Sequence, residues 1–178
     1  ITLGDVMGKG LGAGVMAASL QTAARLTNNG CAPSVVLAQS AAAVREQLER
    51  ASTFATVVQA HVDVTTGRVQ YADAGHGLTI IVRADGSYTR LGSVNLPLGV
   101  DDEEELADAE AMIETGEIFV SLSDGALDAF PDSVDPLADV AALIAGTSTA
   151  EAAVEATITL STMPGIADDI TVVALLRE

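Results

Sequence analysis

Apolar residues along this 178-residue chain recur first with the period of an α-helix and later with that of a β-strand. Residues 11–29 have apolar side chains at helical spacing and end at Asn28-Asn29-Gly30, and a second helical pattern follows from Pro33. The positions expected to face the core are Val15, Met16, Leu20, Ala23, Ala24 and Leu26 in the first helix and Val35, Val36, Leu37, Ala41, Val44 and Leu48 in the second.

From Thr53 onward the pattern changes to short runs that are typical of strands. The runs at residues 54–64, 68–74, 78–84 and 87–91 are separated by turn residues. Asp85-Gly86, between the last two runs, is the strongest hairpin signal in the chain. We therefore expect an antiparallel meander in this part of the chain.

The remaining third of the chain predicts further strands and two short helices. Residues 109–114 and 117–122 are expected to pair around Thr115-Gly116, and helices are expected at 135–145 and 149–161, before a closing strand at 169–176. Helices flank antiparallel strands without regular βαβ alternation, which favours an α+β layered fold in a single domain over residues 1–178. Because Ile1-Thr2-Leu3 has the pattern of a strand already under way, we expect the chain to be part of a longer protein, with its first strand or strands upstream.

Composition narrows the possible functions. The net charge of -17 comes from 25 acidic and only 8 basic residues, which argues against a nucleic-acid partner because phosphate backbones bind Lys and Arg. The acidic run at 101–105 is interpreted as a solvated loop, with docking of a basic partner as the alternative. A single cysteine, Cys31, and the absence of a signal-peptide pattern predict a reducing cytoplasm, and no apolar run reaches the ~18 residues of a membrane-spanning helix.

The glycine-rich stretch from Gly4 to Gly10 does not fit the common phosphate-binding loops. A Walker A loop needs four residues between its first two glycines and a hydroxyl residue after the lysine, whereas this stretch has three residues and Gly10. The dinucleotide fingerprint fails because Ala13 stands where its third glycine should be. Zinc is disfavoured because one cysteine and two distant histidines form no ligand cluster.

Three aspartates next to apolar runs favour a different chemistry. Asp5 follows the first apolar residues, Asp124 follows residues 118–122, and Asp168 precedes the closing strand. An aspartate beside glycine is by itself mostly turn chemistry. Three aspartates beside strands indicate a metal site for Mg²⁺ or Mn²⁺ in which all the ligands are oxygen atoms. Two such ions can activate a water molecule and bind a phosphoryl group.

Five blocks of the sequence, in this order, resemble those of the metal-dependent PPM serine/threonine phosphatases, and most closely the bacterial SpoIIE/RsbU-like branch. The resemblance covers nearly the whole chain, and five ordered blocks are far more specific than any one of them. The blocks are Gly4-Asp5-Val6-Met7-Gly8-Lys9-Gly10-Leu11-Gly12-Ala13, Tyr71-Ala72-Asp73-Ala74-Gly75-His76-Gly77, Leu96-Pro97-Leu98-Gly99-Val100, Gly116-Glu117-Ile118 through Ser123-Asp124-Gly125-Ala126-Leu127-Asp128-Ala129, and Asp168-Asp169-Ile170-Thr171-Val172.

The resemblance implies a four-layer αββα sandwich of two antiparallel sheets flanked by helices, with Mn²⁺ or Mg²⁺, two ions in the full-length domain, at the sheet edge. It also implies hydrolysis of phosphoserine or phosphothreonine on a regulatory protein, typically an anti-sigma-factor antagonist in stress-response signal transduction. A sensor domain elsewhere in a longer chain is expected to control this activity.

The resemblance also implies roles for individual residues. Asp5 is expected to bridge both metals, with the backbone carbonyl of Val6 as a further ligand, and Asp124 and Asp168 are expected to complete the first metal site. Asp169 is a weaker candidate ligand, with capping of the last strand as the alternative.

Four residues of the same blocks have more open interpretations. Lys9 is a candidate for binding the substrate phosphate, with a solvated lysine or one that contacts a switch segment as the alternative. Gly8 and Gly10 are expected to let the turn approach the site closely, and His76 is interpreted as a hydrogen-bonded turn residue.

The sequence departs from the family pattern in several places. Gly77 stands where the branch usually has proline, and Ser123 and Asp128 replace the common threonine and glutamate. The acidic ligand of the family's upstream strand would precede Ile1, so the fragment itself is expected to be weak or inactive. The alternative function is a non-catalytic regulatory module that keeps the fold and docks a partner through the helix after Gly10 or through the acidic loop.

Overall fold

The computed structural model describes residues 1–93, 95–101, 105–163, 165–166 and 168–178, and the chain forms two compact units. The first unit comprises residues 1–77 and 92–112, and the second comprises residues 78–91 and 113–178. Each unit contains a four-stranded antiparallel sheet and helices, which confirms the predicted α+β class. The assignment of residues 1–178 to one domain that lacks its first strand stays a prediction.

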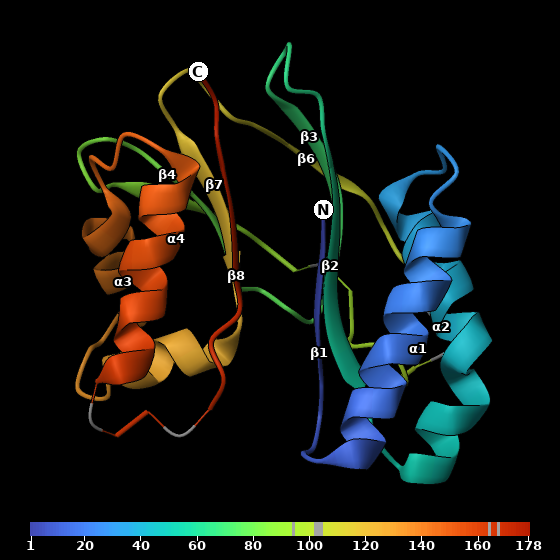
Figure 1. Cartoon of the computed structure of the whole chain (residues 1–178). Helices are drawn as coiled ribbons and strands as arrows, with labels where there is room; N and C mark the ends of the chain where they lie inside the picture. The colour runs from blue at the N-terminus through green and yellow to red at the C-terminus, as the bar shows by residue number, and fades with distance from the viewer. Residues whose placement is uncertain (94, 102–104, 164, 167) are drawn as a thin grey trace. The chain divides into compact units, whose positions relative to one another are not determined.

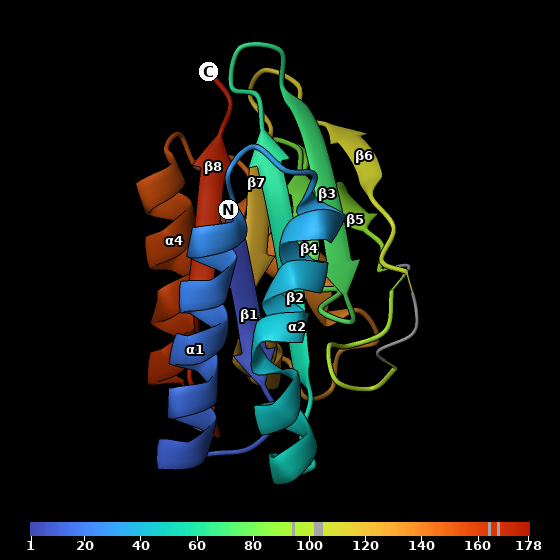
Figure 2. The same cartoon turned by 90° about the vertical axis from the view of Figure 1, so that its right-hand side faces the viewer.

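The sheet of the first unit has the strand order β1-β2-β3-β6, and every neighbouring pair is antiparallel. Two long helices, α1 (Leu11–Thr27) and α2 (Pro33–Ala51), lie side by side over one face of this sheet (Figures 1 and 2). Both helices were predicted from the apolar period, and Pro33 begins α2 as expected. The strands are β1 (Thr2–Val6), β2 (Ala55–Val62), β3 (Arg68–Ala74) and β6 (Ala109–Met112).

Small and medium apolar side chains fill the space between these helices and the sheet. Alanines on both sides allow the helices to approach the strands closely, so a core with few aromatic residues still packs. The buried cluster consists of Val6, Met16, Leu20, Leu37, Val44, Leu48, Ala55, Val57, Ala72, Ala74 and Leu98.

Three predicted core positions of the two helices are wrong. Val15 and Leu26 of α1 are 58% and 72% exposed, and Val35 of α2 is 40% exposed. Val15 and Val35 each precede a buried residue of the same helix by one position, and Leu26 follows buried Ala24 by two positions. One or two positions along a helix turn a side chain by about 100° or 200° around the helix axis, so these three side chains point away from the core. An alanine-rich helix has apolar residues on more than one face, so the apolar pattern alone does not fix which face is buried.

The sheet of the second unit has the strand order β5-β4-β7-β8, again antiparallel throughout. Helices α3 and α4 pack against it through an aliphatic core that includes Ile80, Val120, Val140 and Ile144 (Figure 1). The elements are β4 (Thr79–Val82), β5 (Tyr88–Leu91), β7 (Ile118–Leu122), a 3₁₀ helix η1 (Asp124–Ala129), α3 (Pro136–Ile144), α4 (Ala150–Thr159), a second 3₁₀ helix η2 (Leu160–Thr162) and β8 (Val172–Leu176).

The turns and caps of the second unit follow the sequence signals closely. Asp85-Gly86 forms the predicted hairpin between β4 and β5, with Gly86 at a φ of 84°. The side chains of Asp135 and Thr149 cap α3 and α4 by accepting hydrogen bonds from the N–H groups of Ala138 and Ala152. Both short helices were therefore predicted at the correct places.

Two predicted strand pairings are wrong. The runs around Thr115-Gly116 do not pair, because β6 pairs with β3 in the first unit while β7 pairs with β4 and β8 in the second. The expected meander also stops after β3, because β4 belongs to the other sheet. A turn does form, with the Glu117 N–H donating to the Glu114 carbonyl, but it leads from one sheet to the other.

Candidate functional site

The three candidate aspartates are all exposed and lie at or near strand ends, in two different units. Asp5 is in β1 of the first unit. Asp124 begins η1, one residue beyond Ser123, which follows β7, and Asp168 lies four residues before β8 in the second unit. The closing strand begins at Val172 rather than at residue 169, so Asp168 belongs to the loop that leads into it. Convergence of all three on one metal site stays a prediction.

Asp5 occupies a fixed position on the sheet of the first unit. It pairs with Thr56 of β2, and its neighbour Val6 is buried in the core between sheet and helices. Side chains alternate along a strand, which places Asp5 on the face of the sheet opposite to α1 and α2. The role of the Val6 carbonyl as a metal ligand is not tested by these contacts and stays a prediction.

The loop after Asp5 needs its glycines for backbone conformation. Gly8 and Gly10 have φ angles of 114° and 85°, which side-chain-bearing residues rarely adopt. A Cβ atom at either position would have no atom of the described chain within 4 Å. Close approach of the turn to the metal site, the expected reason for these glycines, stays a prediction.

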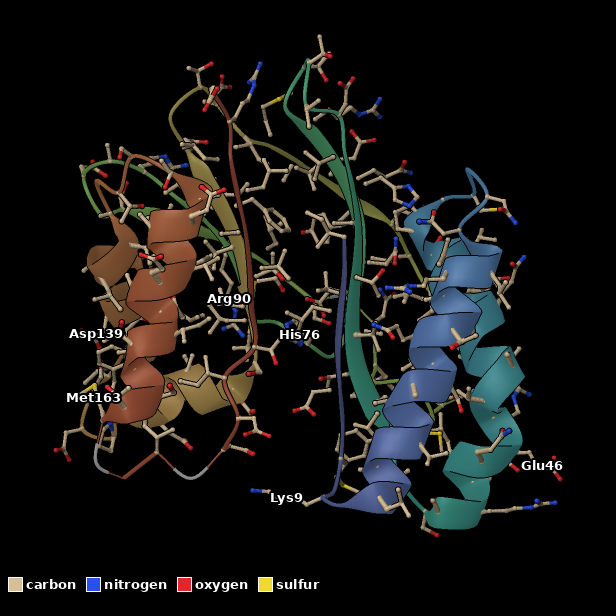
Figure 3. All side chains as sticks on the ribbon, in the orientation of Figure 1. Lys9, Glu46, His76, Arg90, Asp139 and Met163 are labelled. Atoms are coloured by element: carbon tan, nitrogen blue, oxygen red, sulfur yellow. The ribbon has the colours of Figure 1, made fainter. Side chains whose placement is uncertain are left out.

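One end of this loop, at Met7, is anchored within the first unit. The Met7 N–H donates to the carbonyl of Phe54, and the Thr53 hydroxyl donates to the carbonyl of Met7, at 3.0 and 2.8 Å. Lys9 lies at the tip of the loop, and its side chain extends away from the ribbon (Figure 3). An exposed ammonium group on a flexible stem suits a role in binding phosphate, which stays a prediction.

The loops that carry Asp124 and Asp168 lie against each other in the second unit. A Cβ atom built on Gly125 would lie 2.6 Å from the Asp169 carbonyl oxygen and 3.2 Å from both the carbonyl carbon and the carbonyl oxygen of Asp168. The Asp168 carboxylate accepts a hydrogen bond from the Asp169 N–H at 3.1 Å. The structure thus brings together two of the three predicted metal-binding segments.

A buried carboxylate, Asp73, was missed as a structural residue by the sequence reasoning. It is 1% exposed at the end of β3, and it accepts hydrogen bonds from the N–H groups of His76 and Gly77 at 2.7 and 2.9 Å. Burial, followed by the negative charge of Asp73, raises the pKa of the Tyr71 hydroxyl. The spacing of Asp73 to the following glycines is the signal that could have indicated this turn.

The interpretation of His76 as a hydrogen-bonded turn residue agrees with this geometry. The residue is buried, and its N–H is held by the carboxylate of Asp73. The turn is further tied by Ser93, whose hydroxyl accepts the Gly75 N–H at 3.0 Å, and by Asn95, whose amide donates to the Asp73 carbonyl at 3.1 Å. His76 therefore has a structural setting within the first unit.

The donor set suits a hard cation such as Mg²⁺ or Mn²⁺. Asp5, Asp124 and Asp168 offer carboxylate oxygens at exposed positions, which is the ligand type that these ions prefer. Within the described ranges of the chain, no group of three or more His, Cys, Asp and Glu side chains lies close enough to hold a metal ion. The fit therefore rests on the chemistry of the donors and on the contact between the Asp124 and Asp168 loops.

No helix in the described parts of the chain combines the length and the apolar character that crossing a bilayer requires.

Comparison with known proteins gives a family match over the whole chain. The model of the family described as Stage II sporulation protein E (SpoIIE) matches residues 1–178. Protein IcfG of Synechocystis sp. (strain ATCC 27184 / PCC 6803 / Kazusa) is 25% identical over 156 residues, and the match covers 72% of this chain and 25% of that protein. The chain thus spans about a quarter of the length of this curated relative.

Solved structures share the fold. The RsbU and RsbW domains of Rv1364c from Mycobacterium tuberculosis align with a TM-score of 0.77 and 24% identity, over 99% of this chain and 52% of that one. The SiaA-PP2C domain of Pseudomonas aeruginosa aligns with a TM-score of 0.81 and 19% identity, over 99% of this chain and 75% of that one. At these identities the similarity establishes the fold alone.

Two further structures of this fold contain metal ions. RsbX in complex with magnesium aligns with a TM-score of 0.75 and 14% identity, over 97% of this chain and 78% of that one. The catalytic domain of the serine/threonine protein phosphatase PstP in complex with 2 manganese ions aligns with a TM-score of 0.70 and 16% identity, over 97% of this chain and 85% of that one.

Proposed function

The chain belongs to the SpoIIE family, the RsbU/SpoIIE-like bacterial branch of the PPM serine/threonine phosphatases. From this membership we propose that the chain hydrolyses phosphoserine or phosphothreonine on a regulatory protein. The observation that carries the proposal is the family match over residues 1–178. An anti-sigma-factor antagonist is the proposed class of substrate. The proposed architecture is the αββα arrangement of the two sheets and their helices.

We propose that Asp5, the Val6 carbonyl, Asp124 and Asp168 hold Mn²⁺ or Mg²⁺, with Asp169 as a further candidate ligand. The magnesium in RsbX and the manganese ions in PstP support this choice of metal. When bound, such ions supply a nucleophilic water at neutral pH and neutralise charge on the phosphoryl oxygens.

The chain's own residues have separate tasks in this proposal. The β1 ladder holds Asp5 in register, and the contact around Gly125 holds the Asp124 and Asp168 loops together. Lys9, at the tip of its loop, provides a cation for the substrate phosphate.

Regulation and location complete the proposal. Because the chain covers only 25% of IcfG, we propose that it acts within a longer protein that also contains a sensor domain. The single cysteine is consistent with a cytoplasmic location.

The proposal is tested by phosphatase activity on p-nitrophenyl phosphate with added Mn²⁺, measured on the full-length protein. Asp5→Asn and Asp168→Asn are each expected to lower kcat/KM by at least roughly 100-fold, because loss of a direct ligand costs no less than loss of its supporting groups. Asp132→Asn, at an exposed position outside the candidate site, is the matched control and is expected to keep full activity. Unchanged activity in both site variants would contradict the mechanism.

Calorimetry with Mn²⁺ separates this function from the alternative. A phosphatase of this family is expected to bind Mn²⁺ and to lose that binding in Asp168→Asn. A full-length protein that binds no Mn²⁺ would instead indicate a non-catalytic module that keeps the fold and docks a partner.

A further inference from the structure

Ser123 connects the two loops of the second unit that carry candidate metal ligands. It follows β7, precedes Asp124 and is only 8% exposed. Its hydroxyl accepts a hydrogen bond from the Thr171 N–H at 2.9 Å and donates one to the Asp169 carbonyl at 3.0 Å. Its own N–H donates to the Thr171 carbonyl at 2.9 Å. One residue thus makes three hydrogen bonds to the segment that follows Asp168.

The neighbouring glycine shows how closely the two loops approach. Gly125 is buried, and a Cβ atom there would lie 2.6 Å from the Asp169 carbonyl oxygen, well inside van der Waals contact. The Asp169 carbonyl is the same group that accepts the hydrogen bond from the Ser123 hydroxyl. Two independent contacts therefore fix the same point of the Asp168–Asp169 loop against the Asp124 loop.

The chemistry at this point requires a hydroxyl group. A single oxygen atom must accept one N–H and donate one O–H at the same time, which serine and threonine can do. Alanine can do neither, and cysteine is only a weak donor and acceptor. Water has little access to a residue that is 8% exposed, so it cannot easily replace the missing contacts.

We propose that Ser123 is a positioning residue that sets the separation between the Asp124 and Asp168 carboxylates, and thereby the metal affinity of the domain. The inference rests on the proposed function, because it treats these two carboxylates as metal ligands. In this role Ser123 is not itself a metal ligand. It acts through the backbone of the loop that carries Asp168, as outer-shell groups commonly do for metal ligands.

Calorimetry with Mn²⁺ on the full-length protein tests this role. Ser123→Ala is expected to weaken Mn²⁺ binding about 10-fold to 100-fold. Ser123→Thr, which keeps the hydroxyl, is expected to bind as the wild type does. Ser123→Cys keeps a side chain of similar size but forms only weak hydrogen bonds, so it is also expected to weaken Mn²⁺ binding. This variant replaces Ser123→Ala in the test if the alanine variant does not fold.

The matched control is Thr79→Val, which removes another buried hydroxyl of the second unit. Thr79 is fully buried, and its hydroxyl lies 3.0 Å from the Ser121 hydroxyl. We expect Thr79→Val to lower the unfolding temperature without changing the Mn²⁺ affinity. Hydrogen exchange at the Thr171 amide provides a second readout and is expected to accelerate in Ser123→Ala but not in Thr79→Val.

The outcomes separate this inference from the proposed function. If the wild type binds Mn²⁺ and Asp168→Asn abolishes binding, while Ser123→Ala and Ser123→Cys bind normally, the positioning role is wrong and the metal site stands. Equal weakening by Thr79→Val would also overturn the role, because it would indicate general destabilisation. If the wild type does not bind Mn²⁺, the proposed function fails and the positioning role fails with it.

Discussion

Replacement of Asp73 by alanine is expected to destabilise the domain strongly. Asp73 is 1% exposed, and its two carboxylate oxygens accept the N–H groups of His76 and Gly77. Each buried N–H that loses its acceptor costs about 1–3 kcal/mol, so the two together cost about 2–6 kcal/mol. A typical domain has a free energy of unfolding of about 5–15 kcal/mol. Asp73→Ala is therefore expected to remove a large part of the stability.

The conservative variant and a matched control define the size of the effect. Asp73→Asn keeps one acceptor oxygen, so we expect it to lose about 1–3 kcal/mol. Asp63 also accepts two backbone N–H groups, those of Thr65 and Thr66, but in an exposed turn. Water can replace its carboxylate there, so Asp63→Ala is expected to cost no more than about 1 kcal/mol.

Urea unfolding followed by far-UV circular dichroism measures these differences, with the midpoint and the m value recorded for each variant. The expected order of stability is wild type, Asp63→Ala, Asp73→Asn and then Asp73→Ala. If Asp73→Ala loses no more stability than Asp63→Ala, the buried carboxylate does not stabilise the turn and the reasoning is refuted.

Three further predictions concern stability. Gly75→Ala is expected to unfold the domain at markedly lower urea concentration, because Gly75 has a φ of 73° and a Cβ there would lie 2.4 Å from the Pro97 side chain; an unchanged midpoint would contradict this. Burial lowers the pKa of His61 from its ordinary 6.5, so the contribution of His61 to stability is present above pH 6.5 and is lost as the pH falls through that value toward the lower pKa of the folded state. His61→Gln should reduce the difference in urea midpoint between pH 7.5 and pH 5.5, and an identical difference in the variant and the wild type would refute the linkage. Asp135→Ala removes the side-chain acceptor for the Ala138 N–H and is expected to lower the free energy of unfolding by about 0.5–2 kcal/mol in the same assay. An unchanged free energy of unfolding would show that water caps the helix equally well and would contradict this prediction.

Local signals in the sequence predicted most of the elements but not how the strands are distributed between the sheets. Asp85-Gly86 joins two strands that pair with each other, as its turn chemistry indicates. Thr115-Gly116 has a similar pattern, but the Gly116 N–H donates to the Arg177 carbonyl and the turn joins strands of different sheets. A turn motif specifies the local backbone, whereas strand pairing depends on residues far away in sequence.

The candidate site shows the same division between local and distant information. The chemistry of Asp124 and Asp168 was predictable, because a carboxylate next to a strand end is a visible pattern. The hydrogen bonds that join their loops through Ser123 were not, because the partners are 46 and 48 residues away and the sequence does not display the register between them. Asp73 was hidden for a different reason, since an aspartate near glycines is usually an exposed turn residue.

The division of the chain into two units has a consequence for its synthesis. The hairpin of β4 and β5 is translated before residues 92–112, which belong to the first unit, and before β7, the strand beside which it lies. At about 5–20 residues per second, the ribosome needs roughly 2–6 s to make the residues from Gly92 to Leu122, and during this time the hairpin has no neighbouring strand. Neither unit corresponds to an uninterrupted gene fragment, so each can be produced alone only after the coding sequence has been rearranged.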